Sequence, residues 1–247
     1  MGGLNNAIRE VYDVFSRYHL PEDIEMSPYR DPEREIGPLK LKPLRQVEAA
    51  DLESYANHAL TTVGDVDLFR YALPRLLELC TQGALTTEVE ILLSKLRYGE
   101  WATWPEQEQE SIQRLLGAWW NELLYESVDF DNGKAHETLC GIAQAVDDLT
   151  PYLEIWEGHE GPTATDQIAR VFNTMYNGNK GRFVAGAFWA GRATQAEQVW
   201  QWMTRSVVLD RLQHGLLIAI ERDQEELLEA YEWAVTGLGY LLVDTRP

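Results

Sequence analysis

The sequence predicts an all-α fold in which stacked antiparallel helical hairpins form an irregular, HEAT-like α-solenoid. Apolar residues recur at helical spacing along most of the chain, and capping residues, prolines and glycines separate these segments. The predicted connections are short, which makes successive helices antiparallel neighbours. With 247 residues, 45% of them hydrophobic, the chain can build a substantial core, and we expect one domain over residues 1–247.

The N-terminal residues predict one helix followed by a proline-rich arm. Ile8, Val11 and Phe15 fall at helical spacing and predict a helix over residues 4–18. Five of the ten prolines then lie within residues 20–45, a density that excludes a helix and a central strand. Because this arm also carries apolar residues such as Ile36, we expect it to lie extended across the helical body.

Start and stop signals delimit the helices in the middle of the chain. Gly64 ends a helix predicted over 48–63, and Asp65 can cap the next helix, which reaches residue 80. Pro74 is expected to kink or split that helix. Two capping boxes, Thr87-x-x-Glu90 and Thr103-x-x-Glu106, predict the starts of two more helices, the second spanning 105–127 with a wide apolar stripe.

The C-terminal half continues the helical pattern. The apolar run 183–190 fits either a buried helix or a short strand, and its length cannot decide between them. Thr194-x-x-Glu197 is another capping box. The remaining predicted elements are a turn over 129–133 and helices over 134–149, 150–158, 165–176, 194–220 and 223–242.

The charge of the chain argues against two classes of partner. The 40 acidic and 21 basic side chains give a net charge of −19, whereas nucleic-acid backbones and anionic membranes attract basic surfaces. The N-terminus lacks the profile of a signal peptide, and the longest apolar stretches are far shorter than the roughly 20 residues that cross a bilayer. We therefore expect a cytoplasmic protein that binds neither nucleic acid nor membrane.

The acidic excess is concentrated in the middle of the chain. Residues 51–150 carry 18 acidic and 6 basic side chains, a net charge of −12. Such clustering costs stability through self-repulsion, but it steers a basic partner toward the surface that carries it. The alternative is that these carboxylates coat the solvent faces of the helices.

Motifs of catalysis and metal binding are missing from the sequence. Cys80 and Cys140 stand outside any CxxC or Cys/His cluster, and the histidines are dispersed. No serine stands in G-x-S-x-G, and neither a dinucleotide fingerprint nor a Walker sequence occurs. We therefore predict no catalytic residue, no metal ligand and no cofactor, and an enzyme is the less favoured class.

Two neighbouring clusters are candidates for partner binding. The first is a helix–turn–helix corner in which Arg70 can pair with nearby acids, and the second is a loop with two tryptophans beside the next helix. Tryptophans beside carboxylates are typical of protein interfaces, although they could equally cap the core beneath the long helix. The predicted partner-binding residues are Asp65, Asp67, Arg70, Glu100, Trp101, Trp104, Glu106, Glu108 and Glu110.

The same region resembles a group of uncharacterised bacterial proteins. The similarity covers roughly residues 38–124 and includes Ala59-Leu-Thr-Thr, Gly64-Asp-Val-Asp and Leu73-Pro-Arg-Leu-Leu-Glu-Leu. The resemblance implies an acidic, helical, cytoplasmic bacterial protein. It implies no activity and no catalytic residue.

Together these features favour a non-enzymatic protein that binds a basic protein partner through an acidic helical surface. Its most concrete form is a bacterial immunity protein that neutralises a toxin, such as a nuclease. One alternative is an all-α enzyme or small-ligand protein with a pocket between hairpins, formed by Tyr55, His58, Asp65 and Arg70. Another is a helical adaptor inside a larger assembly.

Overall fold

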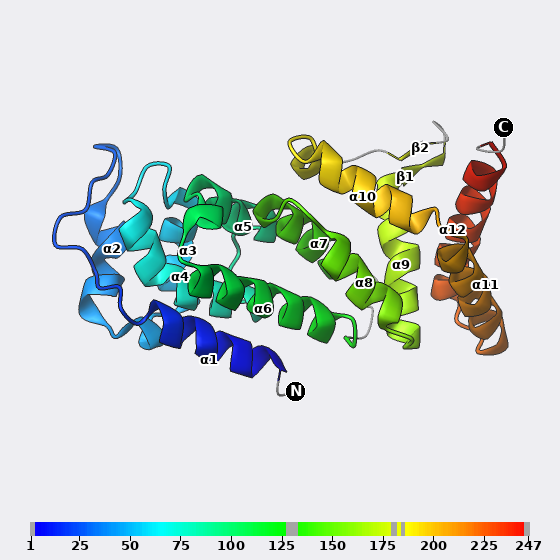
Figure 1. Cartoon of the computed structure of the whole chain (residues 1–247), viewed down its shortest axis with the longest axis horizontal. Coiled ribbons are helices and arrows are strands. Elements are labelled where there is room, and N and C mark those ends of the chain that lie inside the picture. Colours follow the sequence, from blue (N-terminus) through cyan, green and yellow to red (C-terminus); the bar gives the residue numbers. More distant parts are fainter. Residues whose placement is uncertain (1–2, 127–132, 179–181, 184–185, 245–247) are drawn as a thin grey trace. The chain divides into compact units, whose positions relative to one another are not determined.

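The computed structural model describes residues 3–126, 133–178, 182–183 and 186–244, and within them the fold is all-α (Figure 1). Twelve α-helices occur in these ranges, and the β-structure there is limited to one two-residue antiparallel ladder and isolated bridges. Among the described residues, no helix is both long enough and apolar enough to cross a membrane. The chain folds as two compact units, residues 1–119 and 120–247, and the expected single domain stays a prediction.

The first unit is built on two helix pairs whose members pack on one another, α1 with α4 and α2 with α3. Its core contains Phe15, Leu52, Phe69 and Leu76, all buried. A regular solenoid is not confirmed, because α1 contacts a helix distant in sequence, whereas solenoid repeats contact only their neighbours. The elements are α1 Gly3–Phe15, α2 Pro32–Leu41, η1 Leu44–Gln46, α3 Ala49–His58, α4 Val66–Thr81, α5 Val89–Tyr98, η2 Trp101–Thr103 and α6 Glu106–Leu123, which continues past residue 119.

The extended arm expected over residues 20–45 is not confirmed, because α2 occupies much of it. Asp31 caps this helix by accepting a hydrogen bond from a first-turn amide, and Pro32 stands in the first turn, where no amide hydrogen is needed. Pro38 removes one internal hydrogen bond, but Ile36 and Leu39 bury the face of α2 that packs on α3. Burial therefore offsets the cost of an interior proline here.

The predicted cap of α4 is confirmed, whereas the threonine capping boxes are not formed. Asp65 accepts hydrogen bonds from two amides of the first turn of α4, and that helix continues unbroken through Pro74. Thr87 lies before α5 and donates to a carboxylate of Glu53 at 2.5 Å. Thr103 lies in η2 and donates to a backbone carbonyl there. Thr87 is not the cap residue of α5, since Glu88 holds that position without a side-chain cap, and Thr103 is part of η2.

Gly64, in the turn before α4, predicts a measurable loss of stability on substitution. Its φ is +67°, and a Cβ added there would lie 2.3 Å from Cδ2 of Leu68. Gly64→Ala is expected to combine left-handed strain of about 1–2 kcal/mol with an overpacking cost of about 1–3 kcal/mol. Gly83 has a similar φ of +63° but open space around its Cα, so Gly83→Ala should show the strain alone. Urea unfolding of the two variants checks this, and equal losses would contradict the predicted clash.

The second unit packs α9 against both α11 and α12, which form a helical hairpin. Buried residues at its centre include Trp156, Ile168, Phe172, Leu212 and Leu238. The elements are α7 Lys134–Ala145, α8 Thr150–Gly158, α9 Pro162–Met175, β1 Tyr176–Asn177, β2 Arg182–Phe183, η4 Ala187–Trp189, α10 Ala193–Met203, α11 Ser206–Glu221 and α12 Glu225–Asp244.

Three expectations about this unit differ from the structure. The single helix predicted over 194–220 is two helices, α10 and α11, and the residue that precedes α10 at its cap is Arg192 rather than Thr194. Arg192 is buried and donates to the carbonyl oxygen of Ala143 at 2.6 Å, which attaches the start of α10 to α7. The run 183–190 is neither one helix nor one strand, since β2 ends at Phe183 and η4 follows, with residues 184–185 outside the described ranges. Most of the predicted turn over 129–133 also lies outside them.

Candidate functional site

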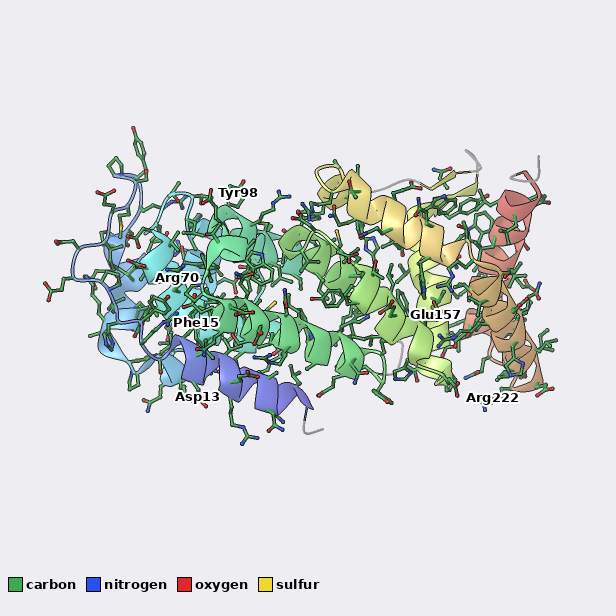
Figure 2. All side chains as sticks on the ribbon, viewed as in Figure 1. Asp13, Phe15, Arg70, Tyr98, Glu157 and Arg222 are labelled. Atoms are coloured by element: carbon green, nitrogen blue, oxygen red, sulfur yellow. The ribbon has the colours of Figure 1, made fainter. Side chains whose placement is uncertain are left out.

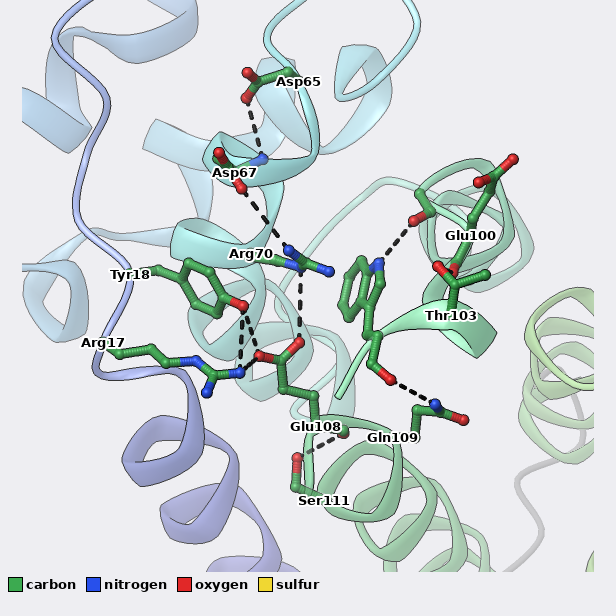
Figure 3. A network of polar contacts seen from close by, with 12 residues as sticks. Arg17, Tyr18, Asp65, Asp67, Arg70, Glu100, Thr103, Glu108, Gln109 and Ser111 are labelled. Carbon is green, nitrogen blue, oxygen red and sulfur yellow. Dashed lines mark hydrogen bonds and ion pairs between the residues drawn. The ribbon is translucent and has the colours of Figure 1, made fainter. Parts of the chain in front are cut away.

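Three of the predicted site residues lie together in the structure. Arg70 contacts both the buried carboxylate of Glu108 and the ring of Trp104 (Figure 3). Glu108 lies in the first turn of α6 and is fully buried. Its Oε1 accepts hydrogen bonds from the hydroxyl of Tyr18, at 2.6 Å, and from the guanidinium of Arg17. Its Oε2 lies 3.7 Å from Nε of Arg70. The carboxylate is thus held between two arginines from different segments.

Arg70 is held between charges and aromatic rings. Its guanidinium carbon lies 4.5 Å from the ring centroid of Trp104 and 5.4 Å from that of Tyr18. A second carboxylate, that of Asp67, lies 3.8 Å away at the protein surface. Cation–π and ionic contacts therefore restrain the side chain of Arg70 from several sides. We call the five residues of this group the Glu108 cluster: Arg17, Tyr18, Arg70, Trp104 and Glu108.

The two tryptophans of the loop are buried. Trp101 is 6% exposed and Trp104 is 3% exposed. Trp104 donates from Nε1 to the carbonyl oxygen of Gly99 at 2.8 Å and makes edge contacts with Phe15 and Phe69. Of the two interpretations drawn from the sequence, burial in the core is the arrangement that the structure shows, so these rings offer almost no surface to a partner.

The other predicted acidic residues are exposed around the cluster. Asp65 and Asp67 stand at the start of α4, Glu100 precedes η2, and Glu106 begins α6; we call these four residues the acidic corner. Figure 3 shows Asp67 next to Arg70, with Asp65 and Glu100 farther from it. Glu110 is exposed as well, but it shares the guanidinium of Arg114 with Glu10, which reduces its uncompensated charge.

Sequence reasoning missed the participation of Arg17 and Tyr18 and the burial of Glu108. The spacing of Glu108 to Ile112 and Leu115 places all three on one helix face, and this signal could have indicated that the carboxylate points inward. No sequence pattern indicates that Arg17 contacts Glu108, because these residues lie 91 positions apart in the chain.

An exposed aromatic residue, Tyr98, was also missed. It is the last residue of α5, it is 64% exposed (Figure 2), and it comes two residues before Glu100. The sequence-based prediction selected the two tryptophans of the following loop and omitted Tyr98, the one aromatic ring of this stretch that a partner can reach. A tyrosine at such a place supplies both apolar area and a hydroxyl for hydrogen bonding.

The residues of the alternative pocket contact different groups in the structure. They are Tyr55, His58, Asp65 and Arg70. Tyr55 is fully buried, and burial, followed by the charge of Asp65, raises the pKa of its hydroxyl far above the ordinary value. His58 lies 3.2 Å from the buried carboxylate of Glu35, while Arg70 belongs to the Glu108 cluster. These contacts stabilise the first unit.

The chemistry available to metals and nucleophiles is limited in the described residues. No group of three or more His, Cys, Asp or Glu side chains in these ranges is placed to hold a metal ion. Burial raises the pKa of the Cys80 thiol to about 12, so this cysteine stays protonated at neutral pH and is a poor nucleophile.

No protein-family model, curated protein or solved structure matches this chain. The chain is acidic, and its described residues are all-α. Its first unit holds a buried ionic cluster beneath exposed carboxylates.

Proposed function

We propose that this chain is a non-enzymatic protein-binding module that docks a basic protein partner on the acidic corner of its first unit. The observation that carries the proposal is the position of four exposed carboxylates around a buried, internally paired cluster, with the exposed ring of Tyr98 beside them. Because the carboxylate of Glu108 is paired with arginines in the interior, the negative field of the corner comes from the four exposed carboxylates that a partner can reach.

Electrostatics and rigidity both support docking at this place. A surface of one sign on a chain with net charge −19 accelerates encounter with a partner of opposite sign. The corner is carried by the capped start of α4 and by the loop that the buried Trp104 attaches to the core, so few side chains beneath it need to be ordered on binding. Tyr98 takes the role of aromatic anchor that the sequence had suggested for Trp101 and Trp104.

The most concrete form of this function is that of a cytoplasmic bacterial immunity protein that neutralises a toxin. An enzyme that cleaves nucleic acid needs a basic face for the phosphate backbone, and an acidic corner complements such a face. Binding there would exclude the substrate without any catalytic group on this chain.

The experiment is co-expression of the chain with the product of the adjacent gene, followed by pull-down and kinetic measurement. Glu100→Lys combined with Glu106→Lys is expected to weaken binding by about tenfold or more at low salt, mainly through slower association, because two attractive charges become repulsive. Tyr98→Ala should instead act mainly on dissociation.

Matched substitutions make this result specific. Glu33 and Glu88 are also exposed carboxylates of the first unit, but they lie outside the acidic corner, so Glu33→Lys with Glu88→Lys changes the net charge equally. We expect the control pair to reduce affinity much less. An equal loss in both pairs, or affinity that does not change with salt, would overturn docking at the corner.

A further inference from the structure

The second unit contains a hydrogen bond between two ring side chains that the proposed function does not use. Trp189 ends η4 and is fully buried, and its Nε1 lies 3.2 Å from Nε2 of His136 in α7. An indole N–H can only donate a hydrogen bond. Nε2 of His136 is therefore the acceptor, which means that the imidazole is neutral and carries its proton on Nδ1.

The bond to His136 is one of several contacts that hold residues 187–192 along α7, and we call these residues the strap. The side-chain amide of Gln144 in α7 donates to the carbonyl oxygen of Phe188 at 2.6 Å. The buried guanidinium of Arg192 donates to two carbonyl oxygens near the end of α7. Neither an amide nor a guanidinium changes its charge near neutral pH. Among these contacts, only the bond to His136 depends on pH.

The surroundings of His136 do not offer a carboxylate to a protonated ring. In the part of the chain that the structure describes, no carboxylate forms an ion pair with this histidine, and Glu197 of α10 instead accepts a hydrogen bond from Gln201. Asp166 of α9 likewise accepts from Tyr231. The charged and titratable residues on the elements around the ring are Lys134, Glu137 and Cys140 on α7, Asp166 and Arg170 on α9, and Arg192 with Glu197 at α10.

We propose that the bond between Trp189 and His136 is an acid-sensitive latch, which holds the strap on α7 at neutral pH and releases it when the imidazole is protonated. Protonation turns Nε2 into a donor, so two N–H groups face each other and the bond is lost. It also places a positive charge in a half-buried position. Together these effects are expected to shift the equilibrium toward the released strap by about tenfold or more.

The direction of the pH dependence follows from the burial of His136. Burial lowers the pKa of this imidazole below the ordinary histidine value of about 6.5. A histidine that is kept neutral by the folded state contributes its stability fully above the ordinary pKa, and this contribution is lost as the pH falls through the lowered pKa. The latch is therefore closed at neutral pH and opens in mild acid.

The test follows the indole N–H of Trp189 by NMR in the full, isotope-labelled chain, from about pH 8 to about pH 4. Trp189→Phe assigns this resonance among the nine tryptophans. The proton is expected to move upfield in acid because it loses its acceptor, with the same midpoint as the ring titration of His136. A resonance that stays constant while His136 titrates would overturn the latch.

Matched substitutions distinguish the latch from general unfolding in acid. His136→Gln keeps an acceptor but cannot be protonated, so the resonance of Trp189 should no longer follow pH. His214→Gln removes an exposed histidine of α11 in the same unit and should leave the titration unchanged. If the resonance of Trp189 followed pH equally in His136→Gln and in the natural chain, protonation of His136 would not be the cause.

A permanent charge at the same position imitates the acid form at neutral pH. His136→Lys is expected to accelerate chymotrypsin cleavage after Phe188 or Trp189 by about tenfold, because the strap leaves α7 more often. His136→Gln should be cleaved as slowly as the natural chain, and equal cleavage of the two variants would contradict the proposal. Because the strap and α7 lie in the second unit, none of these results depends on docking at the acidic corner.

Discussion

Replacing Glu108 by alanine is expected to lower the free energy of unfolding by about 3 kcal/mol. The substitution leaves Arg70 largely buried without its interior carboxylate and deprives the hydroxyl of Tyr18 of its acceptor. Removal of one partner from a buried ion pair commonly costs about 3–5 kcal/mol. We expect the lower end of this range, because Arg17 is half exposed and can turn toward water.

Urea unfolding monitored by far-UV circular dichroism measures this loss. Glu106 and Glu110 stand two residues on either side of Glu108 in the same helix, and both are exposed. Alanine at either control position is expected to change the free energy of unfolding by no more than about 0.5 kcal/mol. If Glu108→Ala resembled these controls, the buried cluster would not hold the first unit together as its contacts suggest.

Replacing Trp156 by alanine is expected to cost about 3–5 kcal/mol in the second unit, where this indole is fully buried. Its ring lies 5.1 Å from that of Trp120 in an edge arrangement and 5.1 Å from that of Trp202 in a stacked one. Its Nε1 also donates to the carbonyl oxygen of Ala164 at 2.9 Å. The substitution therefore removes a large apolar volume, two ring contacts and a buried hydrogen bond together.

The same unfolding measurement applies, since circular dichroism does not depend on tryptophan emission. Tyr240 of α12 is an aromatic residue of the same unit that is mostly exposed, so Tyr240→Ala is expected to change the stability by no more than about 0.5 kcal/mol. A small effect of Trp156→Ala would mean that the neighbouring rings refill the space. That outcome would contradict the rigid packing of the three tryptophans.

Local signals predicted most of the helices, and they failed where tertiary contacts decided the outcome. The cap at Asp65 was predictable because it depends on two amides next to it in the chain. The hydroxyl of Thr87 bonds a carboxylate from α3 instead of capping α5, and no sequence pattern near Thr87 indicates that contact. Helix α2 shows the same limit, since burial against α3 stabilises it despite Pro38.

For the candidate site, the sequence brought Arg70, Trp104 and Glu108 into one set but could not assign their roles. The three were predicted to bind a partner, with burial of Trp104 in the core as an equal alternative, and the structure buries Trp104 and Glu108 almost completely. Tyr98, which remains exposed, was absent from that set. Residue types and spacing indicated the region because aromatic and acidic residues are concentrated there; which of them face solvent depends on how α1, α4 and α6 pack.

The sequence alone determined the all-α class and the location of the acidic excess, because helix periodicity and charge are properties of neighbouring residues. Among the glutamates at positions 106, 108 and 110, the spacing to Ile112 and Leu115 marks Glu108 as the inward-facing one, but only the tertiary structure decided which groups pair with it. Its partners, Arg17 and Tyr18, lie about ninety residues earlier in the chain, and only folding brings them to Oε1 of Glu108. A buried charge is stable only beside such partners, and these partners are set by packing and not by local pattern.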